Sequence, residues 1–243
     1  MSIADPNTFA IAPGYRANLS PAYFDDDTSD GVIWQPDVYP FAAALAEALR
    51  CGQIIDVGCG RGGKLAPLHD RFSIVGLDYG SNLAECRANY AWGTWVDVDL
   101  EAPTVAEDAT WVNRPSVIVS ADVIEHLIDP RSTLGLFRRL LAVSPLAVIS
   151  TPERHLRRGI DHVGPPLNPC HVREWTLSEL CEFCARQGLS VAWSGLTRMN
   201  SMTSDRTTAL VVVTLGTRPD VTSERVAAIA AQHNVTTASI SAS

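Results

Sequence analysis

Hydrophobic positions follow two patterns along most of this chain: short apolar runs, and stretches in which apolar residues recur at helical spacing. The first pattern predicts strands and the second amphipathic helices. We expect strands over 53–57, 73–77, 94–98, 117–120, 146–150, 189–193 and 209–215, and helices over 37–50, 63–70, 81–88, 130–143 and 177–187. Asp129 before Pro130, and Thr176 before Glu179, predict the starts of two of these helices.

Strands and helices therefore alternate, and this order is typical of a parallel sheet with helices on both faces. Ligands of such α/β proteins bind beyond the carboxyl ends of the strands. We expect the functional residues in the loops at that edge.

Three segments are predicted. Residues 37–218 hold the alternating elements. Residues 1–36 contain many prolines and glycines, which is typical of a solvated loop. They also carry aromatic residues that are costly to leave in water, including Tyr23, Phe24 and Trp34, so the alternative is a lid. Residues 219–243 contain a weak helix and a Ser/Thr-rich stretch, and we expect a flexible tail.

Composition narrows the class of protein. The 243 residues are 46% hydrophobic and 19% charged, which is typical of a globular enzyme. The net charge of −8 disfavours a nucleic-acid partner. We find no apolar run of membrane-spanning length and no signal peptide, so with six scattered cysteines we expect a reduced, cytoplasmic protein without membrane insertion. The oligomeric state is not predicted.

A glycine-rich turn follows the first strand, where Gly58, Gly60 and Gly63 form a Gly-x-Gly-x-x-Gly pattern. Such a turn lets a ligand approach the backbone and the N–H groups at a helix start. The pattern alone suits a dinucleotide or S-adenosylmethionine (SAM).

Acidic residues at three successive strand ends favour SAM. Asp56 would repel a pyrophosphate but suits the ammonium of a methionine group. Asp78 follows Gly58 by 20 residues and is placed to accept hydrogen bonds from ribose hydroxyls. Asp97 can accept from the adenine amine.

The segments Ile54–Gly62 (IIDVGCGRG), Val75–Tyr79 (VGLDY) and Ser120–Pro130 (SADVIEHLIDP) resemble motifs of class I SAM-dependent methyltransferases, above all the ubiquinone-biosynthesis O-methyltransferases. The resemblance implies a Rossmann-like, seven-stranded α/β sheet whose last strand is antiparallel. It also implies a set of cofactor-binding residues for the methionine end, the ribose and the adenine, namely Asp56, Gly58, Cys59, Gly60, Asp78, Tyr79, Asp97 and Val98.

Methyl transfer to an oxygen requires an oriented acceptor and the removal of its proton. Glu125, His126 and His171 lie in loops after the fourth and fifth strands and are the candidate catalytic residues. With Asp122 they resemble the divalent-cation site of metal-dependent 2′-O-methyltransferases of small RNAs, which implies Mg²⁺ or Mn²⁺. The alternative is a metal-free site in which His126 acts alone.

The segment 154–174 combines rigid prolines with clustered Arg and His, and we predict that it binds the acceptor. The candidate contacts are Arg154, His162, Asn168 and Arg173. Its likeness to methyltransferases of glycan assembly implies a saccharide hydroxyl as the acceptor. The alternatives are a phenolic or quinone precursor, RNA, an NAD(P)-dependent oxidoreductase, and a SAM-binding module without catalysis.

Overall fold

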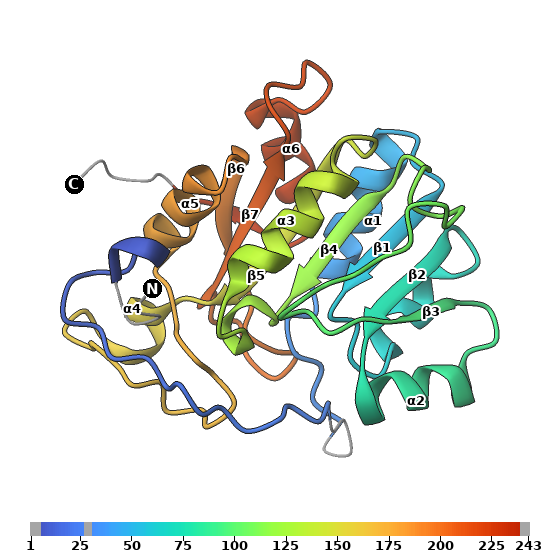
Figure 1. Ribbon diagram of the computed structural model, residues 1–243. Helices are drawn as coiled ribbons and strands as arrows, with labels where there is room; N and C mark the ends of the chain where they lie inside the picture. Colours follow the sequence, from blue (N-terminus) through green and yellow to red (C-terminus); the bar gives the residue numbers. More distant parts are fainter. Residues whose placement is uncertain (1–5, 27–30, 239–243) are drawn as a thin grey trace.

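The computed structural model, which describes residues 6–26 and 31–238, contains eight strands in a single sheet (Figure 1). The strands are β1 (Gln53–Val57), β2 (Ser73–Asp78), β3 (Thr94–Asp97), β4 (Val117–Ala121), β5 (Leu146–Pro152), β6 (Ser190–Thr197), β7 (Thr208–Thr214) and β8 (Thr236–Thr237). Their order is β3-β2-β1-β4-β5-β7-β6-β8. Neighbours from β3 to β5 are parallel, whereas β7 is antiparallel to both β5 and β6. The predicted seven-stranded sheet with an antiparallel last strand is confirmed, and β8 adds two residues beside β6.

Helices cover both faces of this sheet. The α-helices are α1 (Val38–Ala48), α2 (Gly80–Asn89), α3 (Pro130–Leu140), α4 (Arg154–Arg158), α5 (Leu177–Arg186) and α6 (Ser223–Ala230). Short 3-10 helices are η1 (Pro6–Phe9), η2 (Gly63–Leu68) and η3 (Ile124–His126). Apolar residues of α3 and α5 pack on one face of the sheet, and those of α1 and α6 pack on the other (Figure 1). The continuous apolar runs of the inner strands follow from burial on both sides.

Two predicted helix starts are confirmed by their hydrogen bonds. The Asp129 carboxylate accepts from the backbone N–H of Arg131, and Thr176 and Glu179 form a reciprocal capping box. The predicted helix over 63–70 is instead the 3-10 helix η2, since Pro67 lacks the N–H that an α-helical hydrogen bond would use.

The described part of the predicted flexible tail, residues 219–238, contains the helix α6 and the short strand β8. Residues 239–243 lie outside the described residues. Val221, Val226, Ala230 and Val235 are buried against the face that α1 covers, and β8 pairs with β6. The burial of these apolar side chains stabilises an ordered arrangement over the described part of residues 219–238.

The N-terminal segment crosses the carboxyl edge of the sheet before the chain enters α1 (Figure 1). The backbone N–H groups of Arg16, Asn18 and Ala22 donate to the carbonyl oxygens of Val163, Val172 and Pro169, at 2.8, 2.8 and 3.0 Å. These bonds tie the segment to the loop after β5. Residues 1–5 and 27–30, which are part of the predicted lid, lie outside the described residues.

Candidate functional site

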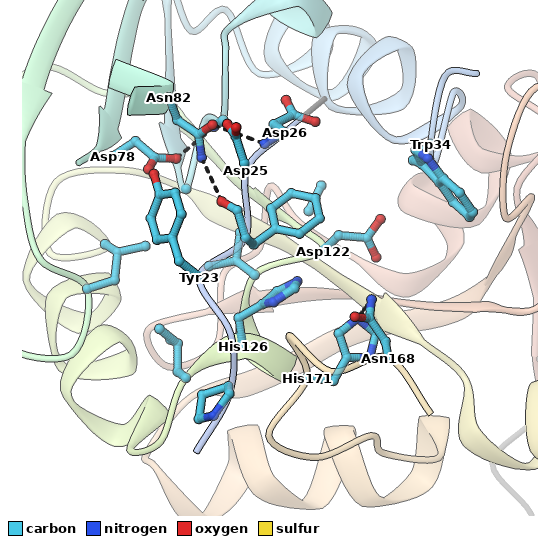
Figure 2. A pocket seen from close by; sticks show the side chains of 18 of the residues that line it. Tyr23, Asp25, Asp26, Trp34, Asp78, Asn82, Asp122, His126, Asn168 and His171 are labelled. Atoms are coloured by element: carbon cyan, nitrogen blue, oxygen red, sulfur yellow. Dashed lines mark hydrogen bonds between the residues drawn. The ribbon is translucent and has the colours of Figure 1, made fainter. Parts of the chain in front are cut away.

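A cavity of about 560 Å³ opens at the carboxyl edge of the sheet. Figure 2 shows Asp78 and Asn82 at one side, Asn168 and His171 at the other, and His126 and Asp122 between them. We call the two regions the glycine side (Gly58, Gly60, Asp78, Tyr79) and the histidine side (His126, Asn168, His171), and all of these residues line the cavity.

The glycine side depends on residues without a side chain. Gly58 and Gly60 have φ angles of +84° and +54°, which residues with a side chain rarely adopt. A Cβ atom at Gly58 would also overlap the side chain of Val123. The turn therefore needs glycine at both positions, and without side chains its backbone can be approached closely.

Asp78 holds this turn in place. Its carboxylate accepts from the backbone N–H of Gly60 at 2.7 Å and of Tyr79 at 2.8 Å. Burial raises the pKa of Asp78 to about 6, against the effect of these hydrogen bonds. A carboxylate in this setting gains from further donors such as a diol.

Asp56 lies beneath the turn and does not line the cavity itself. It is fully buried, and one carboxylate oxygen accepts from the Tyr39 hydroxyl at 2.9 Å while the other has no hydrogen-bond partner among the described residues. Burial raises its pKa to about 7. A cationic group in the cavity would relieve this energetic cost.

The end of β3 places different residues at the cavity than we predicted. Asp97 is exposed and outside the cavity, and Val98 is buried in the core while its N–H donates to the Asp78 carbonyl. Asp99 and Leu100 line the cavity instead. Because β3 ends at Asp97, two further residues carry the chain to the cavity.

Residues 21–26, which we call the strap, cross both sides of the cavity. The Asp26 carboxylate accepts from the backbone N–H of Arg61 at 3.2 Å, directly over Gly60. The Tyr23 ring meets that of Tyr79 edge to face, and the Phe24 ring lies 4.8 Å from that of His126. The strap thus occupies the position where an anionic ligand group would meet the glycine turn.

Two imidazoles meet edge to face on the histidine side. The ring centroids of His126 and His171 are 4.8 Å apart. His126 Nδ1 lies 3.0 Å from the Cys170 carbonyl oxygen, so it carries the proton and its Nε2 has a free lone pair. Burial lowers the pKa of His126 to about 3 and keeps this ring neutral.

Glu174 orients the second imidazole. It accepts from His171 Nδ1 at 2.9 Å and from Arg158 at 2.9 and 3.1 Å. Burial alone would raise the pKa of Glu174, but these hydrogen bonds lower it to about 2. Asn168 Nδ2 lies 3.0 Å from His171 Nε2 and completes the arrangement.

Three possible metal ligands lie together at this side of the cavity. Ligand atoms of Glu125, His126 and His171 all lie within 4.8 Å of one another. Glu125 is fully buried, and one of its oxygens accepts from Thr151 at 2.8 Å, while the other has no hydrogen-bond partner in the part of the chain that the structure describes. Asp122, the fourth predicted ligand, is not in this cluster, and its carboxylate accepts from the Gln35 amide.

Burial raises the pKa of Glu125 well above its usual range, and the nearby Asp122 carboxylate raises it further. Both histidines donate from Nδ1 to a protein oxygen, the arrangement that metal-bound imidazoles commonly have. The residues present therefore fit a divalent cation.

Comparison with known proteins decides the family. A family model described as a methyltransferase domain matches residues 37–192. The chain belongs to the methyltransferase domain family. A protein named probable S-adenosylmethionine-dependent methyltransferase in Mycolicibacterium smegmatis is 32% identical over 149 residues, covering 59% of this chain and 55% of that protein. A ubiquinone biosynthesis O-methyltransferase of Cereibacter sphaeroides is 30% identical over 105 residues, covering 42% of each.

This methyltransferase spans about half the length of the curated relatives it matches. Among solved structures, the methyltransferase crystallised with the Haloferax volcanii Trm112 activator has a TM-score of 0.57 at 16% identity, covering 79% and 93% of the two chains. The methyltransferase domain of bacterial CtHen1-C has a TM-score of 0.55 at 19% identity, covering 75% and 98%. These likenesses show the fold. The family decides against an NAD(P)-dependent oxidoreductase and makes SAM the methyl donor.

Three of the four residues predicted to bind the acceptor lie outside the methyltransferase cavity. Arg154 is buried and donates to Glu179 at 2.7 Å and to the Glu174 carbonyl oxygen. Arg173 is buried over the Phe9 ring and donates to two backbone carbonyl oxygens. His162 is half-buried away from the cavity. Arg154 and Arg173 are thus buried and engaged by Glu179 and by backbone carbonyl oxygens, which the sequence does not show. Asn168 lines the cavity.

Other residues that line the cavity of the methyltransferase were not among the predicted site residues. Trp34, Lys64, Arg157 and Asp99 line the cavity, and Lys64 lies over the ring of Tyr39. No motif marks them in the sequence. For Arg157, the sequence offered one indication, namely that it lies close to two other arginines. No helix among the described residues has the length and apolarity to cross a membrane.

Proposed function

We propose that this methyltransferase transfers the methyl group of SAM to a hydroxyl of a small molecule. The observation that supports this most is the single cavity in which the glycine turn and Asp78 face a pair of imidazoles. In the transfer, an acceptor oxygen forms the bond to the methyl carbon and the C–S bond breaks. Its electron pair stays on sulfur as S-adenosylhomocysteine forms, and the hydroxyl proton leaves to a base or to water.

The proposed cofactor pose follows the charges on the glycine side. The ribose hydroxyls would donate to Asp78, Asp56 would stabilise the ammonium from below, and Tyr79 with Asp99 and Leu100 would hold the adenine. Asp78 suits this role because buried carboxylates form strong charge-assisted hydrogen bonds.

The preferred acceptor is a saccharide. Support comes from the polar groups of the histidine side, which offer several donors and acceptors to a molecule with many hydroxyls. A phenolic acceptor is the second candidate, because Phe24 and Trp34 bring aromatic surface to the same cavity. The name of the Cereibacter sphaeroides relative points in the same direction.

His126 and His171 are the proposed groups for proton removal, and Glu174 would stabilise a positive charge on His171. The pKa of about 3 disfavours His126 as a base. We assign the main role to His171 on geometry, because Glu174 holds its Nδ1 and an acceptor hydroxyl would replace Asn168 at its Nε2. If Mg²⁺ or Mn²⁺ takes part, Glu125, His126 and His171 would hold it, and when bound it would supply charge that lowers the pKa of an acceptor hydroxyl.

The strap is the proposed lid. Asp26 sits where the methionine carboxylate would meet the glycine turn, so the strap must move before SAM binds. Its aromatic residues would then close over the acceptor. Cytoplasmic localisation stays a prediction.

The test is transfer of an isotopically labelled methyl group from SAM to pools of saccharides and phenols, with and without EDTA. We expect labelled product with the wild type and much less at limiting SAM with Asp78→Ala, which should weaken SAM binding by about 1–3 kcal/mol. SAM affinity without transfer to any pool would instead identify a binding module. Full transfer in EDTA, with no gain when Mg²⁺ or Mn²⁺ is added, would reject the metal.

A further inference from the structure

Three arginines occur in α4, and their surroundings differ. Arg154 is paired with Glu179 at 2.7 Å, and Arg158 is paired with Glu174 at 2.9 Å. Arg157 forms no ion pair and no side-chain hydrogen bond with any residue that the structure describes. It is half-buried and lines the cavity.

Acidic groups around Arg157 are already engaged, and Glu153, one turn earlier, accepts from the backbone N–H groups of Leu156 and Leu177. Glu174 is held by Arg158 and His171. Asp122 is close enough for Arg157 to influence it electrostatically, yet its carboxylate accepts from Gln35 and forms no ion pair with Arg157. A partly desolvated guanidinium without an anion is costly, and a ligand anion in the cavity would offset that cost.

Trp34 gives a second, independent feature of the same cavity. Its side chain is 39% exposed although its backbone is held by a bridge to Asn200, so the ring is presented by a fixed segment. Figure 2 shows it beyond Asp122, on the opposite flank of the cavity from Asp78. An exposed indole face of this kind is suited to stack on a flat or ring-shaped ligand.

We propose that Arg157 binds a carboxylate of the acceptor, so that the substrate is a hydroxylated ring acid such as a uronate or a hydroxybenzoate. This proposal rests on the proposed methyltransferase function. A guanidinium matches a carboxylate with two parallel N–H···O bonds, which fix orientation as well as position. Arg157 would hold the acid group and Trp34 would hold the ring. A hydroxyl of the same ring would then face the histidine side.

The test compares two acids with their neutral analogues. The probes are methyl glucuronide against methyl glucoside, and 3,4-dihydroxybenzoate against 3,4-dihydroxybenzamide, titrated calorimetrically into protein saturated with S-adenosylhomocysteine. For at least one pair we expect the acid to bind about tenfold more tightly or better, the usual effect of a charge-assisted contact. Arg157→Gln should bring the two affinities within about twofold, and Arg157→Lys should keep part of the preference.

Arg50→Gln serves as the control, because Arg50 is an exposed cation outside the cavity. It should leave the preference unchanged. The proposal is overturned if neither acid is preferred, if neither acid binds, or if the preference survives Arg157→Gln. If Arg157→Gln fails to fold, Arg157→Lys is the deciding variant. A preference for the acid that is lower than in the wild type supports the contact, and a preference equal to that of the wild type contradicts it. Failure of S-adenosylhomocysteine to bind would instead overturn the proposed function.

Discussion

The Asp56→Asn substitution tests whether the buried negative charge of Asp56, beneath the glycine turn, lowers the stability of the folded protein. Asp56 is fully buried, and one of its oxygens lacks a hydrogen-bond partner. Its pKa of about 7 in the folded protein, against an ordinary 3.8, means that the folded state binds this proton more tightly than the unfolded state. The wild type therefore loses stability as the pH rises from about 4 to about 7, and little of this effect exists below pH 4.

The difference between 3.8 and about 7 corresponds to about 4 kcal/mol once Asp56 is fully ionised. Asn removes the charge and can still accept from the Tyr39 hydroxyl. We expect Asp56→Asn to be more stable than the wild type by about 2–4 kcal/mol at pH 8 and nearly equal to it at pH 4. The same change should weaken SAM binding by about 5- to 50-fold, because the charge facing the ammonium is lost.

Urea unfolding at pH 4, 6 and 8, followed by circular dichroism, measures this difference. Asp97→Asn is the matched control, since Asp97 is an exposed strand-end carboxylate, and its effect should stay within about 0.5 kcal/mol at each pH. An Asp56→Asn variant that is less stable than the wild type at pH 8, or whose stability difference does not change with pH, would refute the reasoning.

Three further predictions concern the cavity. His171→Ala should lower turnover by about 10²–10⁴-fold and His126→Ala by less, with SAM affinity retained in both; a loss below about threefold in both would show that the imidazoles are structural. Asp99→Asn should weaken SAM binding by about three- to tenfold while Asp97→Asn leaves it unchanged, and the reverse result would return the adenine contact to Asp97. Asp26→Ala should raise SAM affinity by about three- to tenfold in calorimetry, because it removes a competing carboxylate; lower affinity would mean that the strap helps to hold the cofactor.

Local motifs made much of the glycine side predictable. Gly58 and Gly60 predict the turn from the sequence, because their positive φ angles disfavour other residues. Asp78 is predictable because it stands at the end of the next strand, β2, which pairs with β1. Asp97, predicted to contact the adenine, lies outside the cavity, whereas Asp99 two residues later lines it. An apolar-run pattern does not fix where β3 ends, and each residue of extended chain moves the backbone by about 3.3 Å.

The residues around the histidine side were harder to predict. The sequence 154–174 shows many arginines, yet only the fold reveals that Arg154 and Arg173 are buried structural cations while Arg157 faces the cavity. For the strap, the sequence offered a lid as one of two alternatives for residues 1–36, but it did not show which residues the segment would contact. Its contact with Arg61 joins segments 35 residues apart, and no periodicity predicts such a pairing.

A crystal structure with S-adenosylhomocysteine bound tests the central claim most directly. The account predicts both ribose hydroxyls within hydrogen-bonding distance of the Asp78 carboxylate, roughly 2.5–3.0 Å, with the sulfur facing the histidine side and the strap displaced from Gly60. A ligand seated elsewhere, or a ribose that makes no contact with Asp78, would contradict it.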